Sequence, residues 1–179
     1  RGRAGALLVD DDFDVLAFNL SAELTYTNLL NLIDLAGCPI RTADRADGDL
    51  LIGVGGHCTY NPEPIADFID VAVLGDGEEA SLLISDIIRE WKLDAREGGR
   101  DGLLLRLAST GAFYVPRFYD VDYLDDGRIQ RIAPNREGVP FQVRKHTLMN
   151  LDEWPYPKHP IVPMAETVHE SYSVEILRG

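Results

Sequence analysis

Short apolar runs and amphipathic segments alternate along the first half of the chain, with glycine-containing turns between them. A short, almost continuous apolar run is typical of a strand that is buried on both faces of a parallel sheet. Such runs predict strands at residues 14–20, 50–54 and 71–74. Apolar positions at helical spacing predict helices at residues 24–35 and 78–91, and a proline near its start indicates a short helix at 62–68. The alternation predicts an α/β fold, namely an open, mostly parallel sheet of the Rossmann-like or flavodoxin-like kind with helices on both faces.

The two longer predicted helices each have a broad apolar face that is expected to pack on the sheet. For the first helix the face comprises Leu24, Tyr26, Leu29, Leu30, Leu32, Ile33 and Leu35, and for the last it comprises Leu82, Leu83, Ile84, Ile87, Ile88 and Trp91. Gly37 and Pro39 are expected to end the first helix, glycine as its C-terminal cap and proline because it cannot continue the helix.

From residue 101 onward the pattern changes. Residues 103–108 predict a short helix, the turn Asp125-Asp126-Gly127 predicts a small β-hairpin, and residues 141–146 predict a further strand. Four of the ten prolines lie within residues 155–163, which predicts a semi-rigid linker, and residues 173–179 have the pattern of a strand. The expected divisions are an α/β domain at 1–111, a β-rich extension at 112–150, and a proline-rich linker with one strand at 151–179.

Three loops are expected to share one edge of the sheet, because the carboxyl ends of parallel strands meet there. Ligands of open α/β sheets bind at that edge. The candidate cofactor-binding residues are Ser21 and Thr25 after the first strand; Gly55, Gly56, His57, Asn61 and Glu63 after the second; and Gly75, Asp76, Gly77 and Glu78 after the third.

The chemistry of the three loops differs from one to the next. Ser21 either caps the following helix or helps its first turn to hold an anion. Paired Gly55 and Gly56 allow a ligand to approach the backbone closely. The acids after Gly77 favour the helix dipole and would bind hydroxyl or amide groups, but they would repel a phosphate. The glycine spacing matches neither the dinucleotide-binding pattern nor the P-loop.

Composition excludes several classes of protein. A formal net charge of −13 argues against broad binding of nucleic acid, which needs a positive face. No apolar run is long enough to cross a bilayer, so a soluble, cytoplasmic protein is expected. Cys38 and Cys58 are expected to remain unlinked thiols. His57 beside Cys58 does not complete a metal site or a catalytic set, so we expect neither in this chain.

Several motifs in combination resemble one known family. They are Glu-Leu-Thr-Tyr-Thr-Asn at 23–28, Gly-Gly at 55–56, Asn-Pro-Glu-Pro at 61–64, Ala-Asp-Phe-Ile-Asp at 66–70, Gly-Asp-Gly-Glu-Glu at 75–79, Tyr-Val-Pro-Arg-Phe-Tyr at 114–119 and Pro-Ile-Val-Pro at 160–163. The combination resembles the N-terminal region of radical SAM proteins that carry a cobalamin-binding-like domain ahead of their catalytic barrel. The resemblance covers about residues 14–179.

The resemblance implies a role for each part of the chain. Residues 1–111 would form the cobalamin-binding-like domain, without the family's first strand and helix, and the three loops would face cobalamin. No Asp-x-His-x-x-Gly pattern supplies a lower ligand for the cobalt. Residues 174–179 would lead into a barrel whose three cysteines hold a [4Fe-4S] cluster that cleaves S-adenosylmethionine. Cluster and S-adenosylmethionine are expected only in the full-length parent, because two cysteines cannot hold that cluster.

Three hypotheses for function follow. The first is a non-catalytic accessory domain that binds cobalamin and presents it to the radical SAM barrel of the same protein. The second is a structural or docking module of that parent with no ligand of its own. The third is a stand-alone small α/β enzyme, for which the sequence offers neither a Gly-x-Ser-x-Gly elbow nor a P-loop.

Overall fold

The computed structural model describes residues 13–155 and residue 175. The chain divides into two compact units, Arg1–Met149 and Asn150–Gly179. The described part of the second unit contains the 3-10 helix η7 (Leu151–Glu153). The proline-rich stretch and the strand predicted at 173–179 lie almost wholly outside the described residues.

A four-stranded sheet forms the centre of the first unit. Its order is β1 (Val15–Asn19), β2 (Leu51–Gly55), β3 (Val71–Val73) and β4 (Phe113–Tyr114). The first three strands are parallel, with Val15 opposite Leu51 and Gly53 opposite Val71, and β4 runs antiparallel to β3. The fold is therefore α/β with a mostly parallel sheet, as the sequence predicts. β4 comes from the segment expected to form the β-rich extension, yet it joins this sheet.

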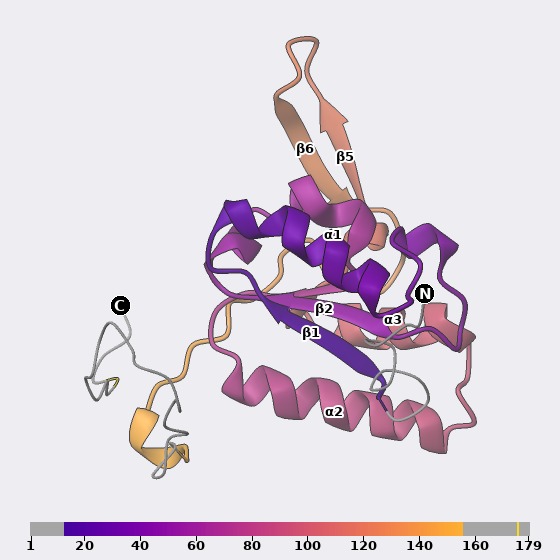
Figure 1. Ribbon diagram of the computed structural model, residues 1–179, viewed down its shortest axis with the longest axis vertical. Coiled ribbons are helices and arrows are strands. Elements are labelled where there is room, and N and C mark those ends of the chain that lie inside the picture. Colours follow the sequence, from indigo (N-terminus) through magenta and orange to yellow (C-terminus); the bar gives the residue numbers. More distant parts are fainter. Residues whose placement is uncertain (1–12, 156–174, 176–179) are drawn as a thin grey trace. The chain divides into compact units, whose positions relative to one another are not determined.

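Helices cover the sheet above and below (Figure 1). On one side lies α1 (Tyr26–Leu35), and on the other lies α2 (Glu78–Leu93), which packs against α3 (Gly99–Ser109). The core is apolar and contains Leu29, Ile33, Leu51, Ile52, Val71, Ile88, Trp91, Leu104, Leu107 and Phe113, all buried. Among the described residues no helix is both long enough and apolar enough to span a membrane.

Short 3-10 helices make the remaining connections. They are η2 (Glu23–Thr25), η3 (Thr42–Asp44), η4 (His57–Tyr60), η5 (Glu63–Phe68) and η6 (Pro116–Phe118). The predicted helix at 62–68 is thus a 3-10 helix with Pro62 at its N-cap. The helix predicted at 103–108 begins earlier, at Gly99.

The predicted hairpin is confirmed. It consists of β5 (Tyr119–Tyr123) and β6 (Ile129–Pro134), which pair antiparallel and extend away from the sheet (Figure 1). The prediction of a strand at 141–146 is wrong. Residues 141–146 form an irregular segment whose single bridge, a parallel one between His146 and Gly75, lies just beyond the end of β3.

The apolar faces are buried less completely than the pattern predicts. The first strand is not buried on both faces: Ala17 and Asn19 are exposed, because β1 is an edge strand of the described sheet. The first helix buries Leu29 and Ile33 but leaves three leucines exposed, since a narrower stripe meets the sheet than expected. The exposed ones are Leu24, Leu32 and Leu35, and Leu82 of α2 is exposed in the same way.

Candidate functional site

The three predicted loops do converge at the carboxyl edge of the sheet. Because β1, β2 and β3 are parallel, the loops that follow them leave from the same edge. Backbone hydrogen bonds join the first loop to the second: Leu20 N–H donates to Gly55 O at 2.7 Å, and Cys58 N–H donates to Leu20 O at 3.0 Å. The carboxyl edge, defined here as residues 20–26, 55–63 and 74–78, is therefore held together mainly by main-chain contacts.

Ser21 does not cap the first helix. It is exposed, and Ala22 is the N-cap of η2 because the chain turns into that 3-10 helix one residue later than predicted. Thr25 is the N-cap of α1, but its hydroxyl donates backward to Ala22 O at 2.6 Å. The two residues shape the turn, and the Ser21 hydroxyl faces solvent.

Gly56 makes a close approach to the protein's own backbone. Its φ of 98° and ψ of −178° are accessible to glycine and strained for other residues. A Cβ at this position would lie 2.7 Å from Leu20 O and would also collide with the Asn19 amide oxygen. The packing of β1 against the second loop thus explains this glycine. At neighbouring Gly55 a Cβ would meet no atom of the described residues within 4 Å.

Thr59, which the sequence pattern does not single out, joins the second loop to the end of β3. It is fully buried, and its hydroxyl lies 2.7 Å from Gly56 O and 2.8 Å from Val73 O. A single hydroxyl has one proton, so it donates to these two carbonyl groups alternately or as a shared bond. A lone threonine after a Gly-Gly pair carries no sequence signal for this contact.

The third loop is covered by a distant segment of the same chain. His146 N–H donates to Leu74 O at 2.8 Å, Asp76 N–H donates to His146 O at 3.1 Å, and Leu148 N–H donates to the Asp76 carboxylate at 2.6 Å. A Cβ at Gly75, where φ is 91°, would collide with His146 O. Gly77 is exposed and Glu78 half-buried, and Glu78 begins α2 with Glu79 in its acidic first turn, as predicted.

Glu63 has a specific partner that the sequence did not reveal. The Tyr114 hydroxyl donates to its carboxylate at 2.5 Å, which connects the second loop to β4. Burial is the main reason that the pKa of Tyr114 is raised above its usual value, and the Glu63 carboxylate adds to the effect. This hydrogen bond joins two segments that are far apart in sequence.

The open part of the carboxyl edge combines polar and apolar side chains. His57 and Asn61 are exposed there, and so are Leu24 and Tyr60, at 90% and 57%. Tyr26 contacts Cys58 between the loops. The pKa of Tyr26 is raised mainly by burial and, to a smaller extent, by the neighbouring Cys58. This edge therefore presents an amphipathic surface on a rigid support.

The cysteines cannot form a cluster site. The chain has two cysteines, one short of the three that a radical SAM cluster needs. Both thiols are free, and Cys58 lies at the carboxyl edge, whereas Cys38 follows α1 near the start of β2. Burial raises the pKa of the Cys38 thiol. Among the described residues no three His, Cys, Asp or Glu side chains gather into a metal-binding group.

The amino edge of the sheet contains a buried ionic cluster of Arg45, Asp70 and Arg100. The side chains of Arg45 and Asp70 are 0% exposed and that of Arg100 is 6% exposed. Asp70 Oδ2 accepts from Arg45 at 2.8 Å and from Arg100 at 2.7 Å, and also from Ile52 N–H at 2.7 Å. Thr42 donates to Oδ1 at 2.7 Å. The cluster joins β2, β3 and α3, and charged residues scattered along a sequence do not reveal such a contact.

These features define an open α/β domain whose carboxyl-edge loops are fixed by contacts within the chain. Residues 9–116 match the family described as "Radical SAM proteins, N-terminal". The match spans more than half of the chain, and this chain belongs to that family. Searches of curated proteins and of solved structures found no match.

Proposed function

We propose that this chain is a non-catalytic accessory domain of a radical SAM protein, and that its carboxyl edge docks against the catalytic domain of that protein. Membership of the N-terminal family supports an accessory role. The observation that carries this proposal is the state of the carboxyl edge: contacts within the chain account for Gly56 and Gly75, while Leu24 and Tyr60 are exposed beside loops joined by main-chain hydrogen bonds. Large exposed apolar side chains on a fixed surface are typical of a docking site.

Docking is tested by binding of this chain to the separately produced radical SAM domain of the parent protein. The double variant Leu24→Asp and Tyr60→Asp is expected to raise the dissociation constant about tenfold or more, because a few side chains buried in the interface supply most of the binding energy. Leu93→Asp is the matched control, since Leu93 is 79% exposed at the end of α2 that lies near the amino edge. Weakening by the control variant but not by the double variant would refute this surface.

Cobalamin binding at the same loops is the second candidate. The observation that favours cobalamin is that three polar residues are exposed at this edge, namely Ser21, His57 and Asn61. They could bind the amide groups that surround a corrinoid ring. Of the paired glycines expected to let a ligand approach, Gly55 faces open space among the described residues, whereas Leu20 O occupies the space beside Gly56. His146 O likewise fills the space beside Gly75 in the third loop. We therefore derive no chemical step through cobalt.

Gel filtration of the chain after mixing with hydroxocobalamin distinguishes docking alone from cobalamin binding. The docking proposal predicts that the chain loses the red chromophore on gel filtration. Retention that is abolished by His57→Ala with Asn61→Ala, and preserved by Asp67→Asn at an exposed position away from the three loops, would instead assign cobalamin to these loops.

A further inference from the structure

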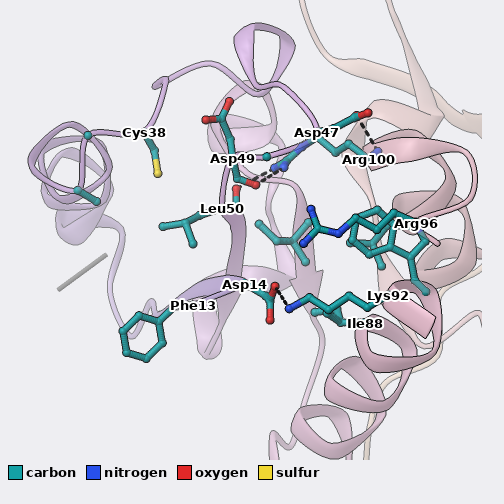
Figure 2. Close-up of a pocket in the computed structure, with 16 residues that line it drawn as sticks. Phe13, Asp14, Cys38, Asp47, Asp49, Leu50, Ile88, Lys92, Arg96 and Arg100 are labelled. Carbon is teal, nitrogen blue, oxygen red and sulfur yellow. Dashed lines mark hydrogen bonds and ion pairs between the residues drawn. The ribbon is translucent and has the colours of Figure 1, made fainter. Parts of the chain in front are cut away.

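A cavity of about 280 Å³ opens at the amino edge of the sheet, at the opposite ends of the strands from the three loops (Figure 2). The starts of β1 and β2, the residues after α1 and the connection from α2 to α3 form its walls. Its volume is close to the lower end of the range for small-molecule pockets. None of the predicted cofactor-binding residues lines it.

Arg96 places a cation in this cavity. Its guanidinium carbon lies 5.5 Å from the centroid of the Trp91 ring, and Trp91 itself is 4% exposed. Figure 2 shows the guanidinium turned into the cavity, toward Leu50. Ala95 and Arg96 hold left-handed backbone angles, with φ of 55° and 58°, which residues other than glycine adopt rarely. Backbone strain of this kind gathers at functional sites.

Three carboxylates of the lining have hydrogen-bond partners within the chain, and only Asp14 is paired with a cation in the described residues. Asp14 pairs with Lys92 at 2.5 Å, Asp47 accepts from Arg100 N–H at 2.8 Å, and Asp49 accepts from the Ala46 backbone N–H at 2.6 Å.

The lining carries as many carboxylates as cations, namely Asp14, Asp47 and Asp49 against Lys92, Arg96 and Arg100. The Arg100 guanidinium shares the single carboxylate of Asp70 with Arg45, and its Nε has no hydrogen-bond partner among the described residues. Arg96 forms no ion pair with a carboxylate within the described part of the chain. The cavity thus combines the Arg96 guanidinium, which no carboxylate of residues 13–155 pairs with, and a buried cluster of two arginines and one carboxylate.

We propose that this cavity binds a small oxyanion, the carboxylate or phosphate group of a small molecule, with Arg96 as its anchor. Trp91 covers one face of the guanidinium, which leaves the N–H groups at its edge directed at a ligand. A guanidinium edge matches the paired oxygens of a carboxylate or phosphate, and charge-assisted hydrogen bonds are the stronger kind. Salt screens the distant part of the net charge of −13, whereas Asp47 and Asp49 line the same cavity and oppose an anion on their side of it.

The test follows the fluorescence of Trp91. The 179-residue chain carries Trp154→Phe, so that Trp91 is its remaining tryptophan. It is titrated with inorganic phosphate and, separately, with succinate, while sodium chloride keeps the ionic strength constant. The expected result is a saturable change in emission for at least one probe, with a dissociation constant of about 1 mM or below. A response to one probe alone assigns the phosphate or the carboxylate class.

Variants connect the response to Arg96. Arg96→Gln is expected to weaken binding about tenfold to a hundredfold. Arg96→Lys is expected to weaken it less, because lysine keeps the positive charge but lacks the paired N–H donors of a guanidinium. Arg128→Gln is the matched control: its side chain is 77% exposed at the hairpin turn, so affinity is expected to stay unchanged. Circular dichroism verifies that each variant is folded.

Two results would overturn the proposal. One is the absence of a saturable response to either probe up to about 10 mM. The other is equal weakening by Arg96→Gln and Arg128→Gln. The experiment uses this chain alone, so its outcome is independent of docking to a catalytic domain.

Discussion

The two edges of the sheet are closed by different kinds of interaction. At the carboxyl edge, neutral main-chain groups meet across the loops, as where Leu20 O accepts from Cys58 N–H and His146 O from Asp76 N–H. At the amino edge, charged side chains meet in the core, with Asp70 between Arg45 and Arg100. The first arrangement depends on glycines that bring backbones together, and the second depends on charges that must all be partnered.

The difference reverses the usual expectation for open α/β sheets. Ligands of such sheets bind beyond the carboxyl ends of the strands. In this chain, contacts with Leu20 and His146 fill the space beside Gly56 and Gly75 at that edge, whereas a cavity lined by Arg96 opens at the amino edge. Gly55 and Gly77 at the same edge make no such contact with the described residues, so a glycine after a strand does not by itself distinguish a tight backbone contact from open space. The structure is needed to identify what each glycine touches.

The largest effect is expected from removing the charge at the centre of the amino edge. Asp70→Asn leaves two buried guanidinium groups without a carboxylate, and breaking a buried ion pair in this way costs about 3–5 kcal/mol. Urea denaturation measures the loss in the free energy of unfolding.

The control for that loss is an exposed acid of the same type. Asp67 pairs with Arg41, but its side chain is 70% exposed, so Asp67→Asn is expected to cost less than about 1 kcal/mol. Equal losses for the two variants would mean that the buried cluster does not stabilise the fold.

A smaller effect is expected from filling the close contact at the carboxyl edge. Gly56→Ala adds a Cβ next to Leu20 O and forces alanine into a glycine conformation, at a cost of about 2–3 kcal/mol. Gly55→Ala adds the same methyl group to open space one residue earlier, so thermal unfolding is expected to detect little change. If Gly56→Ala left stability intact, this glycine would be free to serve a ligand instead.

The sequence was sufficient for the parts of the fold that depend on local pattern. The positions of β1, β2, β3 and α2 follow from apolar runs and helical spacing, and the hairpin follows from the turn at Asp125-Asp126-Gly127. The shared edge of the three loops follows from the parallel order of the strands.

What the sequence could not supply are contacts between distant segments. The predicted strand at 141–146 failed because His146 pairs with the loop after β3, and nothing local indicates that partner. Asp70 and Arg100 are 30 residues apart, and Glu63 and Tyr114 are 51 apart, so their pairing appears only once the chain is folded. Whether a charged side chain is buried depends on the tertiary structure, so it cannot be predicted from the spacing of residues in the sequence.

A third prediction concerns the hydrogen bond that fastens β4 to the carboxyl edge. Tyr114→Phe leaves the half-buried Glu63 carboxylate without this donor, and the expected loss is about 1–2 kcal/mol. The effect also depends on pH. The pKa of Tyr114 is raised above its usual 10.0, so the folded chain holds this proton more tightly than the unfolded chain does. Its contribution is complete below that value and is lost as the pH rises through and beyond it.

Comparison of unfolding free energies at about pH 8 and about pH 11 measures this dependence. The original chain is expected to lose more stability over this interval than Tyr114→Phe, which cannot titrate at this position. An identical loss in both chains would show that Tyr114 ionises as freely in the folded state as in the unfolded chain.

The smallest effect is expected at the connection that directs Arg96 into the amino-edge cavity. Ala95 has a φ of 55°, so Ala95→Gly relieves a strained conformation and is expected to raise stability by about 0.5–1 kcal/mol. Ala43→Gly is the control, because Ala43 lies in η3 without a positive φ and glycine there only adds entropy to the unfolded chain. If the strain holds Arg96 over Trp91, Ala95→Gly also weakens the response to phosphate or succinate while it stabilises the fold. Stability gained with unchanged anion binding would separate the strained backbone from the cavity's function.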